Sequence, residues 1–124
     1  MTAPEDRSIP ENGTGEDHGT TLIGVRPHDD VDLALEYLTA RSEAPAQFAL
    51  GVAAAYRWSM GRSERSPVTG TAVRRPPDLP LLTAEVDAAV VQLEDPTSQA
   101  GARDFTRGVH DGLAWVCGYS DRRI

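Results

Sequence analysis

The same unusual stretch occurs twice in this chain of 124 residues. FALGVAAAYRW, at 48–58, and FTRGVHDGLAW, at 105–115, share Phe, Gly, Val and Trp at identical spacing. SMGRSER follows the first and VCGYSDR the second, so the likeness continues through a Gly, a Ser and an Arg. Two stretches this similar are expected to adopt the same local structure, and this constrains the fold more than any other feature.

The repeat also extends towards the N-terminus. DVDLALEYL, at 30–38, matches EVDAAVVQL, at 85–93, and this pair has nearly the same offset along the chain as the first pair. Isolated matches of Trp or Gly would not preserve both order and spacing. The sequence therefore predicts a tandem duplication, in which each copy has a shorter element followed by a longer one.

Both elements have the apolar spacing of helices. Val31, Ala34, Leu35 and Leu38 recur at i, i+3, i+4 and i+7, and the second copy repeats this pattern. Asp29 or Asp30, Thr83 and Ser98 are expected to cap helix starts, because short polar side chains accept hydrogen bonds from free N–H groups there. Gly61 and Gly118 suit the positions just after helix ends.

Each copy is thus predicted to be an αα-hairpin. One hairpin cannot bury its apolar face alone, so we expect an all-α, four-helix arrangement with pseudo-twofold symmetry. A glycine inside a helix costs about 1 kcal/mol relative to alanine, so Gly51 and Gly108 predict close helix approach. The expected core anchors are, in the two copies, Phe48, Gly51, Val52 and Trp58, and Phe105, Gly108, Val109 and Trp115.

The expected organisation is one domain with a tail. Residues 1–20 are rich in acids, Pro, Gly and Thr, and we expect a disordered acidic tail. Residues 21–124 form a single all-α domain, with the first hairpin at about 29–61 and the second at about 83–118. An Arg/Pro-rich linker, 62–80, joins them.

The composition indicates a cytoplasmic protein. The net charge is −7, which argues against binding of nucleic acid or acidic membranes through the overall field. No apolar run is long enough to span a membrane, and the acidic start is unlike a secretory signal. Arg is abundant and Lys is absent, which is typical of a GC-rich genome and suggests a bacterial origin.

The two long elements differ on the face opposite their shared apolar stripe. The second copy has Arg103, Arg107 and His110 there, whereas the first is apolar nearly all round. A helix that is apolar on both sides is expected to be covered on both sides. The cover is predicted to be a second copy in a twofold dimer, TLIGV or linker segments of the same chain, or another protein. The expected self-association or partner face comprises Ala46, Ala49, Leu50, Ala53, Ala54 and Arg57.

Arginines provide a second candidate surface. The guanidinium groups of the linker and of the last helix could contact an anion or a nucleic-acid backbone. No aromatic residue interleaves with them to stack on bases. A solvated loop is the competing interpretation, and the residues concerned are Arg62, Arg65, Arg74, Arg75, Arg103 and Arg107.

Catalytic and metal sites are not predicted. His28, Asp29, Asp30 and Asp32 lie together, but a helix start already explains acids there. His110 and Asp111 are adjacent and are expected to point in different directions. Cys117 lies among apolar residues and is expected to be a buried thiol. No cofactor is expected.

The function predicted from these observations is a small, non-enzymatic cytoplasmic protein that binds other proteins and forms a homodimer. A nucleic-acid-binding regulator that uses the Arg-rich linker is the first alternative. A ligand-binding protein or enzyme with a pocket between the hairpins is the second. The sequence does not identify the partner or the process.

Overall fold

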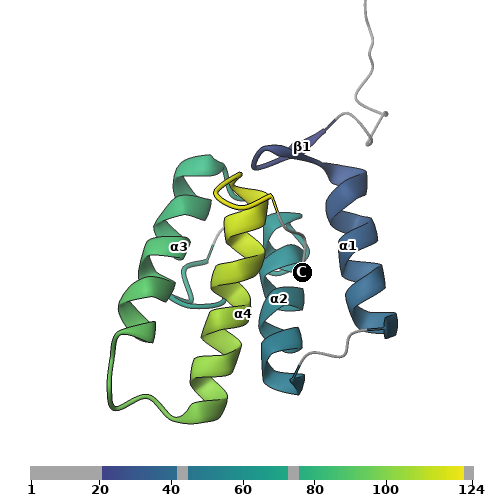
Figure 1. Ribbon diagram of the computed structural model, residues 1–124. Helices are drawn as coiled ribbons and strands as arrows, with labels where there is room; N and C mark the ends of the chain where they lie inside the picture. Colours follow the sequence, from purple (N-terminus) through teal and green to yellow (C-terminus); the bar gives the residue numbers. More distant parts are fainter. Residues whose placement is uncertain (1–20, 42–44, 73–75, 122–124) are drawn as a thin grey trace, which may run out of the picture.

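The computed structural model is an all-α bundle of four helices, as the sequence predicts (Figure 1). It describes residues 21–41, 45–72 and 76–121. The expected tail, 1–20, lies outside the described residues, as do Arg74 and Arg75. The helices are α1 (His28–Arg41), α2 (Ala46–Ser59), α3 (Leu79–Leu93) and α4 (Ala100–Val116), and a short antiparallel pair, β1 (Leu22–Ile23) and β2 (Arg26–Pro27), precedes them.

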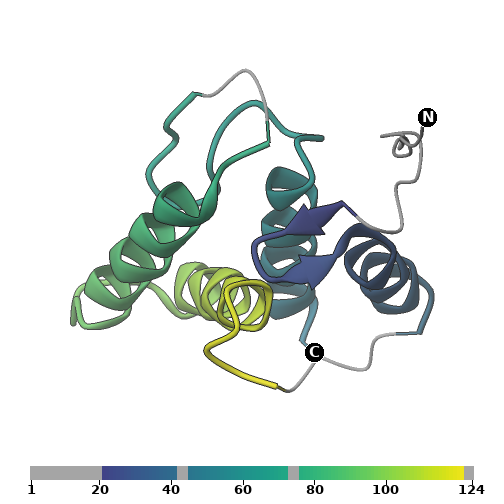
Figure 2. The same ribbon diagram turned by 90° about the horizontal axis from the view of Figure 1, so that it is seen from above.

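The two longer repeat elements form the centre of the bundle. Helix α2 packs against α4, α1 packs on α2, and α3 packs on α4. The order across the molecule is therefore α1, α2, α4, α3, with α1 and α3 at opposite edges (Figure 2). Each expected hairpin is thus an adjacent helix pair, and the two pairs meet through their second helices.

The contact between α2 and α4 depends on the repeated glycines. A Cβ atom at Gly51 would collide with the carbonyl oxygen of Phe105, and one at Gly108 would collide with the carbonyl oxygen of Phe48. The two collisions are reciprocal, as expected where corresponding helices of two hairpins cross. The prediction of close helix approach at Gly51 and Gly108 is therefore confirmed.

One apolar core joins residues of all four helices. Trp58 and Trp115 are both buried, and Tyr56 meets the Trp115 ring edge-on at a centroid distance of 5.8 Å. Phe48 and Phe105 are partly buried against this core. Other buried members are Val31, Leu35, Val52, Leu82, Val86, Val109 and Leu113.

The helix ends follow the sequence only in part. Gly61 and Gly118 have φ values of 79° and 84° just after α2 and α4, so both predicted ends are confirmed. Helix α3 begins one turn before Thr83, because the Asp78 side chain accepts a hydrogen bond from the Leu81 N–H and caps it. Thr83 and Ser98 are not caps, and Asp29 and Asp30 lie inside the first turn of α1.

The segment before α1 packs at the C-terminal end of α4. The Val25 N–H donates to the Val116 carbonyl oxygen at 2.9 Å. Arg26 donates from Nε to the Trp115 carbonyl oxygen and from Nη2 to the Ser120 carbonyl oxygen, each at 2.7 Å. The segment TLIGV, residues 21–25, therefore folds back over the C-terminal end of α4.

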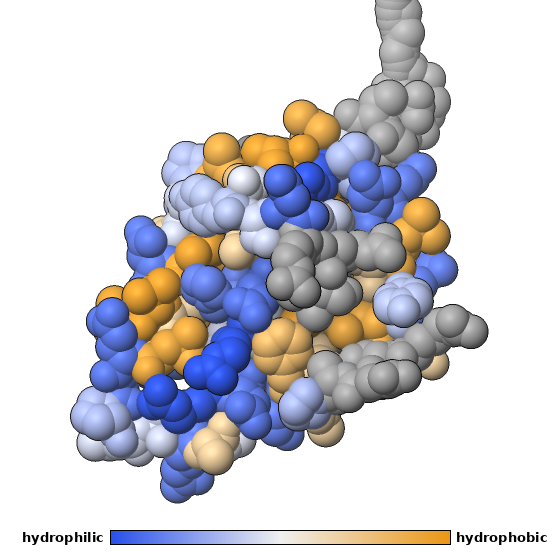
Figure 3. Space-filling model, viewed as in Figure 1, coloured by the Kyte–Doolittle hydropathy of each residue, from blue (hydrophilic) through white to orange (hydrophobic). Residues whose placement is uncertain are grey.

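The surface alternates between apolar and polar bands. In Figure 3, apolar residues gather over α3, and hydrophilic residues lie over α4 beside it. The exposed apolar residues of α3 include Leu79, Leu81, Val90 and Val91.

Candidate functional site

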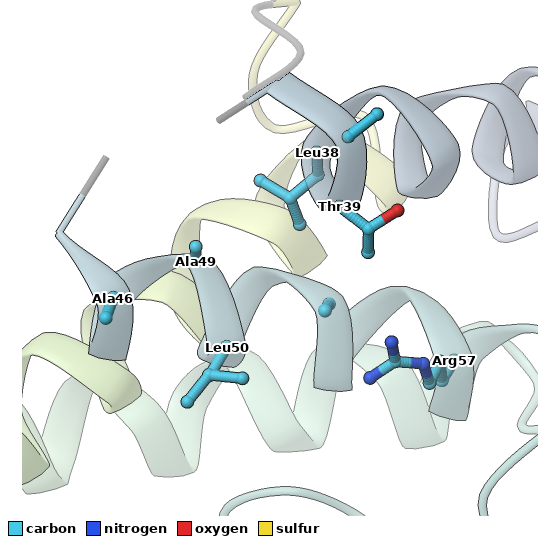
Figure 4. Close-up of a pocket in the computed structure, with 8 residues that line it drawn as sticks. Leu38, Thr39, Ala46, Ala49, Leu50 and Arg57 are labelled. Carbon is cyan, nitrogen blue, oxygen red and sulfur yellow. The ribbon is translucent and has the colours of Figure 1, made fainter. Parts of the chain in front are cut away.

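A groove lies between α2 and the C-terminal part of α1. Its volume is about 530 Å³, and it is open to solvent. Figure 4 shows Leu38 and Thr39 extending from α1 towards α2, which carries Ala49 and Leu50. The wall from α1 consists of Leu38, Thr39 and Ala40, and the wall from α2 consists of Ala46, Ala49, Leu50, Ala53 and Arg57.

The α2 wall has a regular spacing. Ala46, Leu50, Ala53 and Arg57 recur at i, i+4, i+7 and i+11, which places them on one stripe of the helix. Ala53 is buried against the molecule, whereas Leu50 is 52% exposed. Small side chains therefore leave room, and one large apolar side chain projects into that room. A second helix could pack along this stripe as helices pack in coiled coils, where apolar residues recur at the same spacing.

The groove coincides with the partner face expected from the sequence. Of the six residues of that face, Ala54 alone does not line the groove, and it is half-buried. The other wall was not anticipated, because the sequence pattern of α2 says nothing about how far α1 covers it. The short connection from α1 to α2 could have indicated it, since the end of α1 must then lie beside the start of α2.

Arg57 is the one charged residue among the described residues that line the groove. The guanidinium of Arg57 is exposed, and it makes no hydrogen bond or ion pair with any residue that the structure describes. The Thr39 hydroxyl donates to the Glu36 carbonyl oxygen at 3.1 Å, so it is already engaged. The groove therefore favours an apolar segment that carries an acidic group near Arg57.

The candidate anion-binding arginines are mostly engaged within the chain. Arg62 pairs with Asp32 at 3.0 Å, and Arg65 donates to the Gly70 carbonyl oxygen. Arg103 donates to the carbonyl oxygens of Leu93 and Asp95, at the end of α3. Arg107 is exposed on α4. The nucleic-acid alternative thus stays a prediction.

The two His–Asp clusters named from the sequence each involve residues that are adjacent in the chain. The Nδ1 of His110 lies 3.0 Å from the Asp111 carboxylate, so the expectation that these neighbours point apart is wrong. His28 lies 3.5 Å from Asp29, within the first turn of α1. Among residues 21–41, 45–72 and 76–121, no group of three or more His, Cys, Asp or Glu side chains is placed to hold a metal ion.

Cys117 is buried at the end of α4, as expected. Burial disfavours the thiolate and raises the pKa of the thiol to about 11. The neutral thiol is therefore the form present at neutral pH, and it lies away from the groove residues.

No helix within the described part of the chain is both long and apolar enough to cross a bilayer. No protein-family model, curated protein or solved structure matches the chain, so the groove is assessed on its own geometry.

Proposed function

We propose that this chain is a small, non-enzymatic cytoplasmic protein that acts by binding a helix of another polypeptide in the groove between α1 and α2. The observation that carries the proposal is the exposure of Leu50 in a groove lined by alanines, next to Arg57, which has no partner among the described residues. An apolar helix face that fills such a groove buries Leu50 and is stabilised by about 25 cal/mol for each Å² of apolar surface removed from water. Self-association through the same groove is part of the proposal.

The shape and spacing of the groove favour a helix over an extended strand. Beyond its first turn, the backbone of α2 is hydrogen-bonded within its own helix, so the groove there offers side chains and no row of free backbone groups. An added strand would need a row of free N–H and C=O groups, which a sheet edge provides and a helix does not. A helix needs only apolar side chains at i, i+3, i+4 and i+7. Ala46, Ala49, Leu50 and Ala53 of the α2 wall have that spacing.

The test is photo-crosslinking inside the cells that produce the protein. A photoreactive phenylalanine analogue replaces Leu50 in the full chain, and the crosslinked peptides are identified by mass spectrometry. The control carries the same analogue at Leu22, which is 62% exposed on β1 and lies outside the groove. We expect one dominant adduct from position 50 that position 22 does not give. The same diffuse adducts from both positions would contradict a binding groove.

A further inference from the structure

The outer face of α3 is a second apolar surface that no described residue covers. Leu82, Glu85, Val86 and Ala89 are buried, and the opposite side of the helix faces solvent. Val91, on that side, is 66% exposed. Asp87 is the single charged residue within this face, and it makes no hydrogen bond or ion pair with any described residue. We define the outer face of α3 as Pro80, Leu81, Ala84, Asp87, Ala88 and Val91.

The outer face of α3 and the groove are complementary in spacing. Pro80, Ala84, Asp87 and Val91 recur at i, i+4, i+7 and i+11, which is the spacing of the stripe on α2. Two helices with this periodicity can interdigitate along a common seam. The small Ala84 and Ala88 leave room for the projecting Leu50, and Val91 can fill the space above the alanines of the groove.

The two surfaces are also complementary in charge. Among the described residues, each surface has one charged group, a guanidinium in the groove and a carboxylate on the outer face of α3, and neither has a partner there. An Arg–carboxylate pair with one partner on each surface would satisfy both groups. It would also fix the register of the two helices along their axes. Of the other described arginines of the loop and of α4, Arg62, Arg65 and Arg103 already have partners, whereas the exposed Arg107 has none among the described residues.

From these observations we propose that the groove binds the outer face of α3 of a second copy of this chain, with Arg57 of one copy paired to Asp87 of the other. This inference rests on the proposed function, and it names the partner. Helices α1 and α3 lie at opposite edges of the molecule (Figure 2), and the groove lies between α1 and α2, so one copy can offer its groove to one neighbour and its α3 to another. Such a head-to-tail contact repeats from copy to copy, and it ends only if a ring closes.

The shape of the groove argues against twofold pairing of two α2 helices. A twofold contact places the same surface against itself, so a hollow would face a hollow. The outer face of α3 belongs to a helix at the edge of the bundle, and a helix can enter the hollow. Head-to-tail association therefore fills the groove, whereas the twofold dimer expected from the sequence leaves it empty.

The experiment uses two complementary variants in sedimentation velocity. Leu50→Glu blocks the groove and leaves α3 intact, and Val91→Glu blocks α3 and leaves the groove intact. Both side chains are more than half exposed, so both variants are expected to fold. The wild type should form species larger than a dimer as its concentration rises, and each variant should sediment as one 13.3 kDa chain. Leu22→Glu should behave as the wild type.

Mixing gives the decisive measurement. An equimolar mixture of the two variants should form a heterodimer and nothing larger, because one intact groove meets one intact α3. A monomeric wild type, or a Val91→Glu variant that associates as the wild type does, would overturn the inference. A wild type that stops at a dimer would also overturn it, as would a mixture that stays monomeric.

Charge reversal tests the proposed pair. Arg57→Asp and Asp87→Arg should each weaken association at least tenfold, and the double variant should recover most of it. No recovery in the double variant would overturn the pairing of these two residues. A position-50 crosslink to another protein, together with a monomeric wild type, would refute this inference and leave the proposed function intact. Loss of a specific position-50 crosslink would refute both.

Discussion

Glu85 on α3 binds Thr69 of the preceding loop through both oxygens of its carboxylate. The Thr69 N–H donates to Oε2 at 3.0 Å, and the Thr69 hydroxyl donates to Oε1 at 2.9 Å. The Val68 N–H also donates to Oε2. Glu85 is only 3% exposed, so this buried carboxylate is satisfied by the loop and holds the loop against α3.

We expect Glu85→Gln to loosen this loop. The amide keeps one acceptor oxygen, but its NH₂ group meets donors, and each donor left unsatisfied costs about 1–3 kcal/mol. Hydrogen exchange of the Val68 and Thr69 amides should become at least tenfold faster, and the free energy of unfolding should fall by about 1–3 kcal/mol. Glu94→Gln, which neutralises an exposed carboxylate at the C-terminal end of the same helix, should leave the exchange of both amides unchanged and should not lower the free energy of unfolding. Equal effects of the two variants would contradict a specific role for Glu85.

Gly108→Ala is expected to destabilise the bundle. The added Cβ would collide with the backbone at Phe48 and Val52 on α2, and backbone atoms cannot rotate away. Such overpacking costs about 1–3 kcal/mol, which exceeds the gain of up to about 1 kcal/mol in helix propensity. Gly101→Ala on the same helix is the matched control, because the nearest atom to its Cβ is Gln47 Cγ at 3.8 Å. It should be neutral or stabilising in urea denaturation, and a shift of the same sign in both variants would contradict the close contact.

The sequence predicts the helices and the contact between α2 and α4 better than it predicts where α3 begins and which residues line the groove. The repeat identifies two hairpins, and the glycines locate the crossing of α2 with α4, because a glycine inside a helix requires a physical reason. Helix α3 begins before Thr83, the cap expected from the sequence, and it includes Pro80, because proline is tolerated in a first turn. Asp78, just before it, is the cap that the pattern concealed.

Residues that correspond in the two copies do not always play the same part. Glu85 aligns with Asp30, yet Glu85 is buried and Asp30 is exposed. The alignment alone therefore does not distinguish the buried acid from the exposed one. The α2 wall of the groove was predictable from apolar residues all around the helix. The α1 wall was not, because it depends on how two packed helices diverge.

The thiol of Cys117 should make stability depend on pH in the alkaline range. Its pKa in the folded chain is about 11, above its ordinary value of 9.0. Between these values the unfolded chain releases the proton and the folded chain retains it, so rising pH favours unfolding. The free energy of unfolding should therefore fall from about pH 9 to about pH 11. Cys117→Ala should show a smaller fall over this range in urea titrations. An identical slope in the variant would contradict the raised pKa.

Arg26 should hold the β1–β2 segment on the end of α4. Its guanidinium lies 4.9 Å from the centroid of the Trp115 ring, in addition to its two hydrogen bonds to carbonyl oxygens. Charged hydrogen bonds contribute about 1.5–3 kcal/mol, and they also satisfy carbonyl groups that the helix end leaves free. Arg26→Ala should therefore reduce the free energy of unfolding by about 2–3 kcal/mol.

The same Arg26→Ala variant distinguishes release of the β1–β2 segment from destabilisation of the whole bundle. The Val25 amide, which donates to Val116, should exchange faster than amides in the middle of α4, such as that of Val109. Arg62→Ala is the control, because its pair with Asp32 is exposed and contributes no more than about 1 kcal/mol. It should leave Val25 exchange unchanged. Equal acceleration of exchange at Val25 and Val109 in Arg26→Ala would mean that Arg26 stabilises the whole bundle. It would contradict a specific role in holding β1 and β2 against α4.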